Sequence, residues 1–235
     1  MKKCVVFDVD RTIVDSYMPE FLSLKEAIEN VTGKKVSEVE MKQLTSLTTL
    51  EFFKYLHLNK EESDLINKEW ERTFSKYKTR CFPKIKDIIK ELYNNGFTIA
   101  IITSRTMEEF HELDSELRDI LYSFKKIVTS DLIKNPKPNP DSFIFLCNEL
   151  QLIPGEIIYV GDSEIDKTFS KNCNIDFIPA CWENTELKSE KKACFNVEDL
   201  MNAISEYNSL DNVMHKKIFL GGDKYEKSKN NSYGF

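Results

Sequence analysis

Near its start the chain reads VVFDVDRT over residues 5–12, a short apolar run that ends in two acidic residues. The apolar run is typical of a strand buried in a parallel sheet, and Asp8 and Asp10 follow it directly. In open parallel sheets, ligands bind at the carboxyl ends of the strands. Residues two apart in an extended chain project to the same side, so the two carboxylates share one small space. Their repulsion predicts a bound metal, a shared proton, or both.

Further short aliphatic runs alternate with segments of helical periodicity, which predicts an α/β fold with a parallel sheet. The helices carry local signals: Pro83 and Gly96 bound the first, Asn139 and Pro140 open a second, and Ser163 opens a third. We therefore expect a Rossmann-like, three-layer α/β core. Its predicted strands cover residues 4–7, 98–102, 126–129, 157–160 and 175–178.

The region between the first strand and the first of these helices is different, because no convincing strand appears in it. It is predicted to form helices around residues 19–31, after Ser37, from Thr48, and over 61–77. An all-helical insert in this place suggests a cap domain; the alternative is one ordinary mixed domain. The expected organisation is a catalytic core at 1–15 and 82–205, a helical cap at 16–81, and a polar tail at 206–235.

Composition narrows the class of protein. The chain has 235 residues, a net charge of −6 and no basic tract, so a nucleic acid or membrane-surface partner is not expected. No segment approaches the roughly 20 apolar residues of a membrane span. The six cysteines form no C-x-x-C pair, which favours free thiols in a reducing cytoplasm. A small phosphorylated metabolite is the expected partner, and the oligomeric state stays open.

Residues able to handle phosphate follow the other predicted strands. Thr103 and Ser104 end the second strand, and Lys137 lies between two prolines that restrain its backbone. Asp162 and Asp166 bracket the turn after the fourth strand. Taken singly, these residues have ordinary explanations as turn residues, a solvent lysine and helix caps. As an ordered set they are far more specific, and hard oxygen ligands suit Mg²⁺.

This ordered set resembles the haloacid dehalogenase superfamily, in its phosphatase branch. The helical insert resembles the small helical cap of that family. The resemblance covers about residues 1–205. The four family motifs are matched by D-x-D-x-T at Asp8, Asp10 and Thr12, a strand ending at Thr103, Lys137 followed by Pro138, and G-D-x-x-x-D at Gly161, Asp162 and Asp166.

The resemblance implies a role for each residue. Asp8 would attack the phosphorus, and Asp10 would protonate the leaving oxygen and then activate water. Thr103 and Lys137 would hold the phosphoryl oxygens, with Ser104 as a further substrate contact. Mg²⁺ would be bound by Asp8, Asp162 and the backbone carbonyl of Asp10, with Asp166 joining directly or through water.

Two features depart from the family pattern. Arg11 stands where close relatives usually have glycine, so it could contact the distal group of the substrate or merely point to the cap. The cap also lacks a glycine that many relatives carry near their specificity loop, for which residues 43–49 are the candidate here.

The most specific hypothesis is a Mg²⁺-dependent phosphatase that hydrolyses a small phosphomonoester through an aspartyl-phosphate, similar to phosphoglycolate phosphatase-like enzymes. A phosphosugar mutase of the β-phosphoglucomutase type is the first alternative. A non-catalytic phosphate-ligand binding protein is the second. A dehalogenase is disfavoured, since Asp10 and Asp162 suit metal-dependent phosphoryl transfer.

Overall fold

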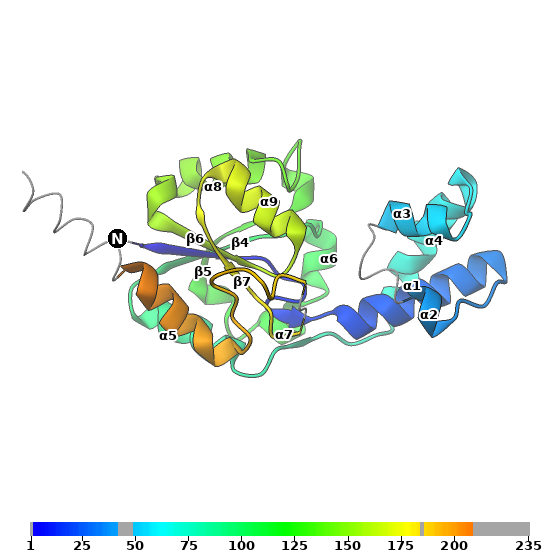
Figure 1. Ribbon diagram of the computed structural model, residues 1–235, viewed down its shortest axis with the longest axis horizontal. Helices are drawn as coiled ribbons and strands as arrows, with labels where there is room; N and C mark the ends of the chain where they lie inside the picture. Colours follow the sequence, from blue (N-terminus) through cyan, green and yellow to red (C-terminus); the bar gives the residue numbers. More distant parts are fainter. Residues whose placement is uncertain (1, 42–48, 184–185, 209–235) are drawn as a thin grey trace, which may run out of the picture.

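The computed structural model describes residues 2–41, 49–183 and 186–208. Figure 1 shows two bodies, an α/β core and a separate group of helices carried on two chain segments. No helix in these described ranges is long and apolar enough to cross a bilayer.

The core is built on a five-stranded sheet of order β5-β4-β1-β6-β7, in which every pair of neighbours is parallel. The predicted parallel α/β core is therefore confirmed. Its central strand is buried along its whole length, as its continuous apolar sequence requires. The strands are β1 (Cys4–Phe7), β4 (Thr98–Ile102), β5 (Phe124–Val128), β6 (Ile157–Gly161) and β7 (Asp176–Pro179).

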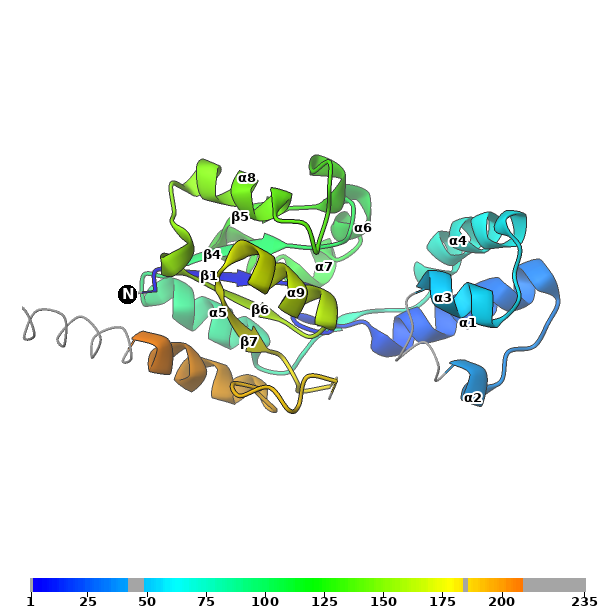
Figure 2. The same ribbon diagram turned by 45° about the horizontal axis from the view of Figure 1, so that its top comes forward.

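Helices cover both faces of this sheet and make three layers (Figure 2). On one face, α5 (Ile85–Asn94) and a helix over residues 200–208 pack on Val5 and Phe7. On the other, α8 (Asp141–Leu150) and α9 (Glu164–Cys173) pack on Val6. Shorter elements of the core are α6 (Met107–His111), α7 (Asp114–Leu117) and the 3-10 turns η2 (Leu121–Ser123), η3 (Ser130–Leu132), η4 (Pro154–Glu156) and η5 (Val197–Asp199).

In the core, the local sequence signals for helix starts and apolar helix faces agree with the structure. Ser163 caps α9 as expected, and the apolar stripe of α5 is buried. Along α9, Phe169 is buried, whereas Ile165, one turn away, is 46% exposed because it lies on the solvent side of the helix. The last helix runs to residue 208, three residues past the expected end of the core at 205.

The insert is helical, as predicted, and has a small core of its own that includes Leu24, Ile28 and Ile66. Its helices are α1 (Tyr17–Thr32), α2 (Glu38–Met41), α3 (Thr49–Tyr55) and α4 (Lys60–Phe74). Gly33 ends α1 with a φ of 67°, a conformation that favours glycine. The predicted start of a helix at Thr48 and nearly all of the candidate loop 43–49 lie outside the described residues.

Two details of α4 correct the sequence prediction. The helix ends at Phe74 rather than near Tyr77. Leu65 lies at helical spacing from the apolar residues of the predicted helix, yet it is 48% exposed, because α4 packs mainly on α1 through Ile66.

Cap and core are joined by a two-stranded antiparallel sheet of β2 (Val14–Asp15) and β3 (Arg80–Cys81). Strands of two residues are too short to show a period, so the sequence did not reveal them. They hold together the two ends of the insert, which are far apart in the chain. Phe82, just after β3, packs edge-to-face on Trp182 of the core, with ring centroids 6.1 Å apart.

Candidate active site

The candidate residues come together at the carboxyl edge of the sheet. Strands β4 and β6 flank β1 in the sheet, so Thr103, Asp8 and Asp162 follow three neighbouring strands. Asp166 lies in the first turn of α9, and Lys137 comes from the loop before α8. The topology therefore brings to one edge the residues that the sequence placed at separate strand ends.

Lys137 is the centre of a buried polar network. Its ammonium lies 2.7 Å from Oδ1 of Asp8 and 2.8 Å from Oδ1 of Asp166. It also donates to the hydroxyl oxygen of Tyr159 at 3.0 Å. Only 3% of the Lys137 side chain is exposed. Burial alone would lower the pKa of Lys137, but Asp166 and Asp8 outweigh it and hold that pKa well above its usual range.

The two carboxyls that share this lysine differ. Burial raises the pKa of Asp8 well above its usual range, although Lys137 opposes the shift, and Asp166 and Asp162 add to it. Burial would also raise the pKa of Asp166, but Lys137 outweighs it and keeps that pKa low. Without a further cation, repulsion among the neighbouring carboxylates makes the ionised form of Asp8 unfavourable, which favours its protonated form.

The donor set fits a hard divalent cation. Ligand oxygens of Asp8, Asp162 and Asp166 all lie within 4.8 Å of one another, and the three residues are buried. Asp166, however, already accepts from Lys137 and Tyr159 on Oδ1 and from the Ser163 hydroxyl on Oδ2 at 2.6 Å. These contacts favour a role for Asp166 in orienting Lys137 and starting α9.

Gly161 has a steric reason to precede Asp162. A Cβ at this position would lie 2.6 Å from Cγ of Asp166, closer than real side chains approach. The glycine therefore lets the Asp166 carboxyl lie against the end of β6.

Asp10 lies apart from the three-carboxylate cluster and is bound by Arg105. Arg105 donates through Nε to Oδ2 at 2.8 Å and through Nη2 to Oδ1 at 2.6 Å. Burial alone would raise the pKa of Asp10, but the charge and hydrogen bonds of Arg105 lower it. A quarter of the Asp10 side chain is exposed, which leaves it accessible to a ligand.

The remaining predicted residues surround these groups. Thr103 is buried, and its Oγ1 accepts from the backbone N–H of Arg105 at 3.1 Å. Ser104 is exposed. Arg11 has a φ of 56°, the left-handed region that favours glycine, and its Nε lies 3.2 Å from Oδ2 of Asp162. The structure thus directs Arg11 toward Asp162, beside the cluster.

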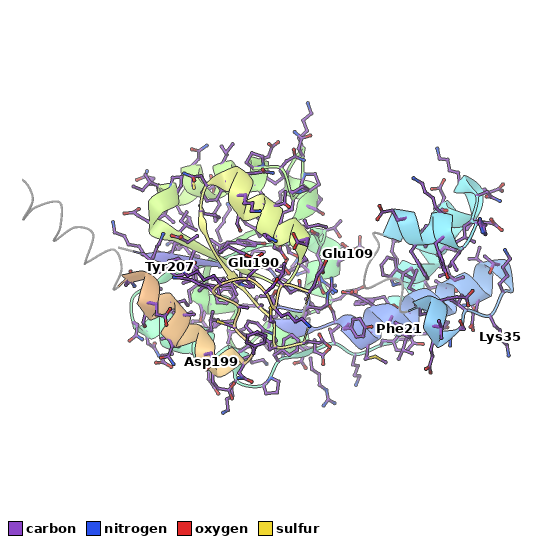
Figure 3. All side chains as sticks on the ribbon, viewed as in Figure 1. Phe21, Lys35, Glu109, Glu190, Asp199 and Tyr207 are labelled. Atoms are coloured by element: carbon purple, nitrogen blue, oxygen red, sulfur yellow. The ribbon has the colours of Figure 1, made fainter. Side chains whose placement is uncertain are left out.

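A cleft of about 500 Å³ opens beside Asp10, between the cap and the core. Helix α4 contributes Trp70 and Phe74, and the core contributes Ser104 and Arg105. Glu109 lies on the side of the core nearest the cap (Figure 3). The cleft also carries the carboxyls of Glu20, Glu71, Glu109 and Glu112. Burial raises the pKa of Glu20 to about 7, and the charge of Asp10 adds to that shift.

Sequence reasoning missed Arg105 and Tyr159. Arg105 directly follows Thr103 and Ser104, so a cation at a strand end was a usable signal. Tyr159 lies inside an apolar strand, where a tyrosine is indistinguishable from ordinary core. Its hydroxyl bonds Lys137, Asp166 and the carbonyl of Ile102 only because of the tertiary arrangement.

Comparison with known proteins finds relatives in sequence and in fold. The family model of the haloacid dehalogenase-like hydrolases matches residues 5–180, a range that includes the cap and every candidate residue above. Phosphoglycolate phosphatase of Vibrio vulnificus is 25% identical over 182 residues, covering 72% of this chain and 79% of the relative. Pyrophosphatase PpaX of Oceanobacillus iheyensis is 20% identical over 212 residues, covering 86% and 95%. The fold is similar to that of a haloacid dehalogenase-like hydrolase from Streptococcus pneumoniae, with a TM-score of 0.71 and 17% identity over 86% of this chain and 98% of that one.

Proposed function

Because the chain belongs to the haloacid dehalogenase-like hydrolase family, we propose that it is a Mg²⁺-dependent phosphatase that hydrolyses a small phosphomonoester through Asp8. One observation carries the proposal. The Asp8 carboxylate lies at the end of the central strand, beside the buried ammonium of Lys137 and the carboxylates of Asp162 and Asp166. Such an arrangement would hold a phosphoryl group between the Lys137 ammonium and a metal bound by the carboxylates.

Asp8 is the proposed nucleophile. Its oxygen forms a bond to phosphorus while the bond from phosphorus to the substrate alcohol breaks. Asp10 enters this step protonated, although Arg105 favours its ionised form, and gives that proton to the departing oxygen. Asp10 then takes a proton from water, whose oxygen attacks the phosphorus and releases Asp8 and inorganic phosphate. Lys137 and Thr103 hold the phosphoryl oxygens through both steps.

Mg²⁺ would be held by Asp8, Asp162 and the backbone carbonyl of Asp10, with Asp166 contributing directly or through water. It would supply positive charge against the phosphoryl oxygens. The helical cap would cover the cleft and keep bulk water from the aspartyl-phosphate.

Two other functions share parts of this site. A phosphosugar mutase would perform the same first step but return the phosphoryl group to a sugar. A non-catalytic binding protein would need no nucleophile, and the buried Asp8–Lys137 pair is an argument against it, since pairing two buried charges is costly without a purpose.

The function is tested with a panel of small phosphate esters, measuring phosphate release with Mg²⁺ and with a chelator. We expect turnover that depends on Mg²⁺, because the buried carboxylates need a cation. Full activity in the chelator would contradict the metal assignment. Conversion of hexose 1-phosphate to hexose 6-phosphate would favour the mutase, and absence of both turnover and metal binding would favour the binding protein.

The charge of the cleft predicts a preference among leaving alcohols. Glu71 and Glu112 form no ion pair with another residue in the described ranges, and the charge of Arg105 is balanced by Asp10. We therefore expect kcat/KM to rise from phosphoglycolate to ethyl phosphate to phosphoethanolamine, about 10-fold across the series, because two partly screened carboxylates contribute about 0.5–1 kcal/mol each.

These three substrates share a two-carbon leaving group and differ in its distal charge. Glu71→Gln combined with Glu112→Gln should reduce the difference in kcat/KM between phosphoglycolate and phosphoethanolamine. The same double variant should leave kcat/KM for ethyl phosphate unchanged. Faster turnover of phosphoglycolate than of phosphoethanolamine by the unmodified protein would contradict the electrostatic argument.

A further inference from the structure

We propose that Arg105 is the positioning residue that holds Asp10 for proton transfer and links this carboxylate to the cap. The inference rests on the proposed phosphatase function and adds a residue to its machinery. It follows from three features of Arg105: how it binds Asp10, what holds it in place, and how its charge is balanced.

The contact between Arg105 and Asp10 is a two-pronged one. Nε and Nη2 of the guanidinium each donate to a different oxygen of the carboxylate, at 2.8 and 2.6 Å. A planar fork of this kind fixes both the position and the rotation of a carboxylate, which a single ammonium cannot do. Asp10 is partly exposed to the cleft, so without the fork its carboxylate would have several orientations available.

Arg105 is itself held by three elements. Its backbone N–H donates to Oγ1 of Thr103 at the end of β4, and its Nη1 donates to the carbonyl of Glu109 in α6 at 3.4 Å. Its guanidinium lies 5.2 Å from the ring centroid of Phe74, the last residue of α4 in the cap. Only 9% of the side chain is exposed.

The other role open to a cation in this cleft is to bind a second anionic group of the substrate. The surroundings oppose that role. Nε and Nη2 of Arg105 both donate to Asp10, and the negative charges of Glu20 and Glu109 also stabilise the charged guanidinium. A substrate anion would have to displace Asp10, the group that the reaction needs.

The test uses two substrates that differ in their need for proton transfer. Ethyl phosphate has a poor leaving group that needs the acid, whereas p-nitrophenyl phosphate needs it little. With Mg²⁺ present, Arg105→Lys should lower kcat/KM for ethyl phosphate by about 10²-fold, because proton transfer typically contributes about 10²–10⁴-fold, and that for p-nitrophenyl phosphate by only about threefold. Phe74→Leu should show the same selectivity with a smaller loss, about 10-fold on ethyl phosphate.

Tyr77→Phe is the matched control in the cap. Its hydroxyl bonds Glu26, away from the cleft, so both rates should stay unchanged. Equal losses on the two substrates for Arg105→Lys would show a merely structural role and overturn the inference. Phosphoglycolate is measured as a third substrate, and a loss confined to it would show that Arg105 binds a substrate anion, which would also overturn the inference.

Thermal unfolding of each variant shows whether it is folded. If Arg105→Lys does not fold, the test rests on Phe74→Leu, because this variant keeps Arg105. A loss of kcat/KM for ethyl phosphate alone then supports the inference, and an equal effect on both substrates overturns it. Failure of the unmodified protein to hydrolyse either substrate would reject the phosphatase function itself. Turnover of both substrates with equal losses in the variants would reject only the role of Arg105.

Discussion

Asp8→Asn is expected to abolish phosphate release and phosphoenzyme formation together. An amide cannot attack phosphorus to form the acyl-phosphate, and no other described carboxylate occupies the position of Asp8 at the end of β1. Asparagine has nearly the same shape and keeps an oxygen toward Lys137, which retains its contact with Asp166. The variant should therefore fold, so that the loss reports on chemistry.

The measurement is rapid-quench trapping of labelled phosphate on the protein, with the labelled residue located by mass spectrometry. The unmodified protein should carry the label on Asp8. Label trapped on the Asp8→Asn variant, or on another residue of the unmodified protein, would reject Asp8 as the nucleophile.

Asp10→Asn is the matched control, because it makes the same replacement of a carboxylate oxygen by an amide nitrogen two residues away. It keeps the nucleophile and removes proton transfer, so turnover should fall by about 10²–10⁴-fold rather than vanish. With p-nitrophenyl phosphate, Asp8 should still become phosphorylated, and the label should persist because water has lost its base. Loss of label in both variants would assign no separate role to Asp10.

Lys137→Met should reduce both stability and turnover. Methionine matches the length of the lysine stem but leaves Asp8, Asp166 and Tyr159 without the ammonium that all three contact. Breaking a buried pair by removing one partner costs about 3–5 kcal/mol, and we expect a loss of stability of that size here. Turnover should fall by about 10²–10³-fold, because a fixed charge toward the phosphoryl oxygens is lost.

The stability of this variant is measured by urea unfolding in chelator, and its turnover with Mg²⁺. Lys134→Met is the control, an exposed lysine of the same loop, and should change stability by no more than about 0.5 kcal/mol. Equal stability of the two variants would contradict the buried network.

The stabilisation that Lys137 provides should decrease as the pH falls. Lys137 lowers the pKa of Asp166 below its ordinary value of 3.8. That part of the stabilisation is present above pH 3.8 and is lost as the pH falls through the lowered pKa of the folded protein. The difference between Lys137→Met and the unmodified protein should therefore shrink in acid.

Most of the fold was predictable because its signals are local. A strand buried on both faces must be apolar nearly throughout, which marks β1, β6 and most of β4 in the sequence. Helix caps such as Ser163 act on the adjacent backbone, so they are also visible locally. The strands β2 and β3, which connect cap and core, escaped prediction because their pairing joins residues far apart and each has only two residues.

The sequence by itself determined the chemical types that stand at the strand ends: Asp8 and Asp10, Thr103, Lys137, and Asp162. It did not determine which of them meet. Lys137 binds Asp8 across 129 residues, and Arg105 binds Asp10 across 95 residues. These contacts exist because the sheet order places β1 between β4 and β6, and because Phe74 of the cap lies against Arg105. Strand order and cap position come from packing between distant segments, so only the tertiary structure could decide that Asp8 pairs with an ammonium and Asp10 with a guanidinium.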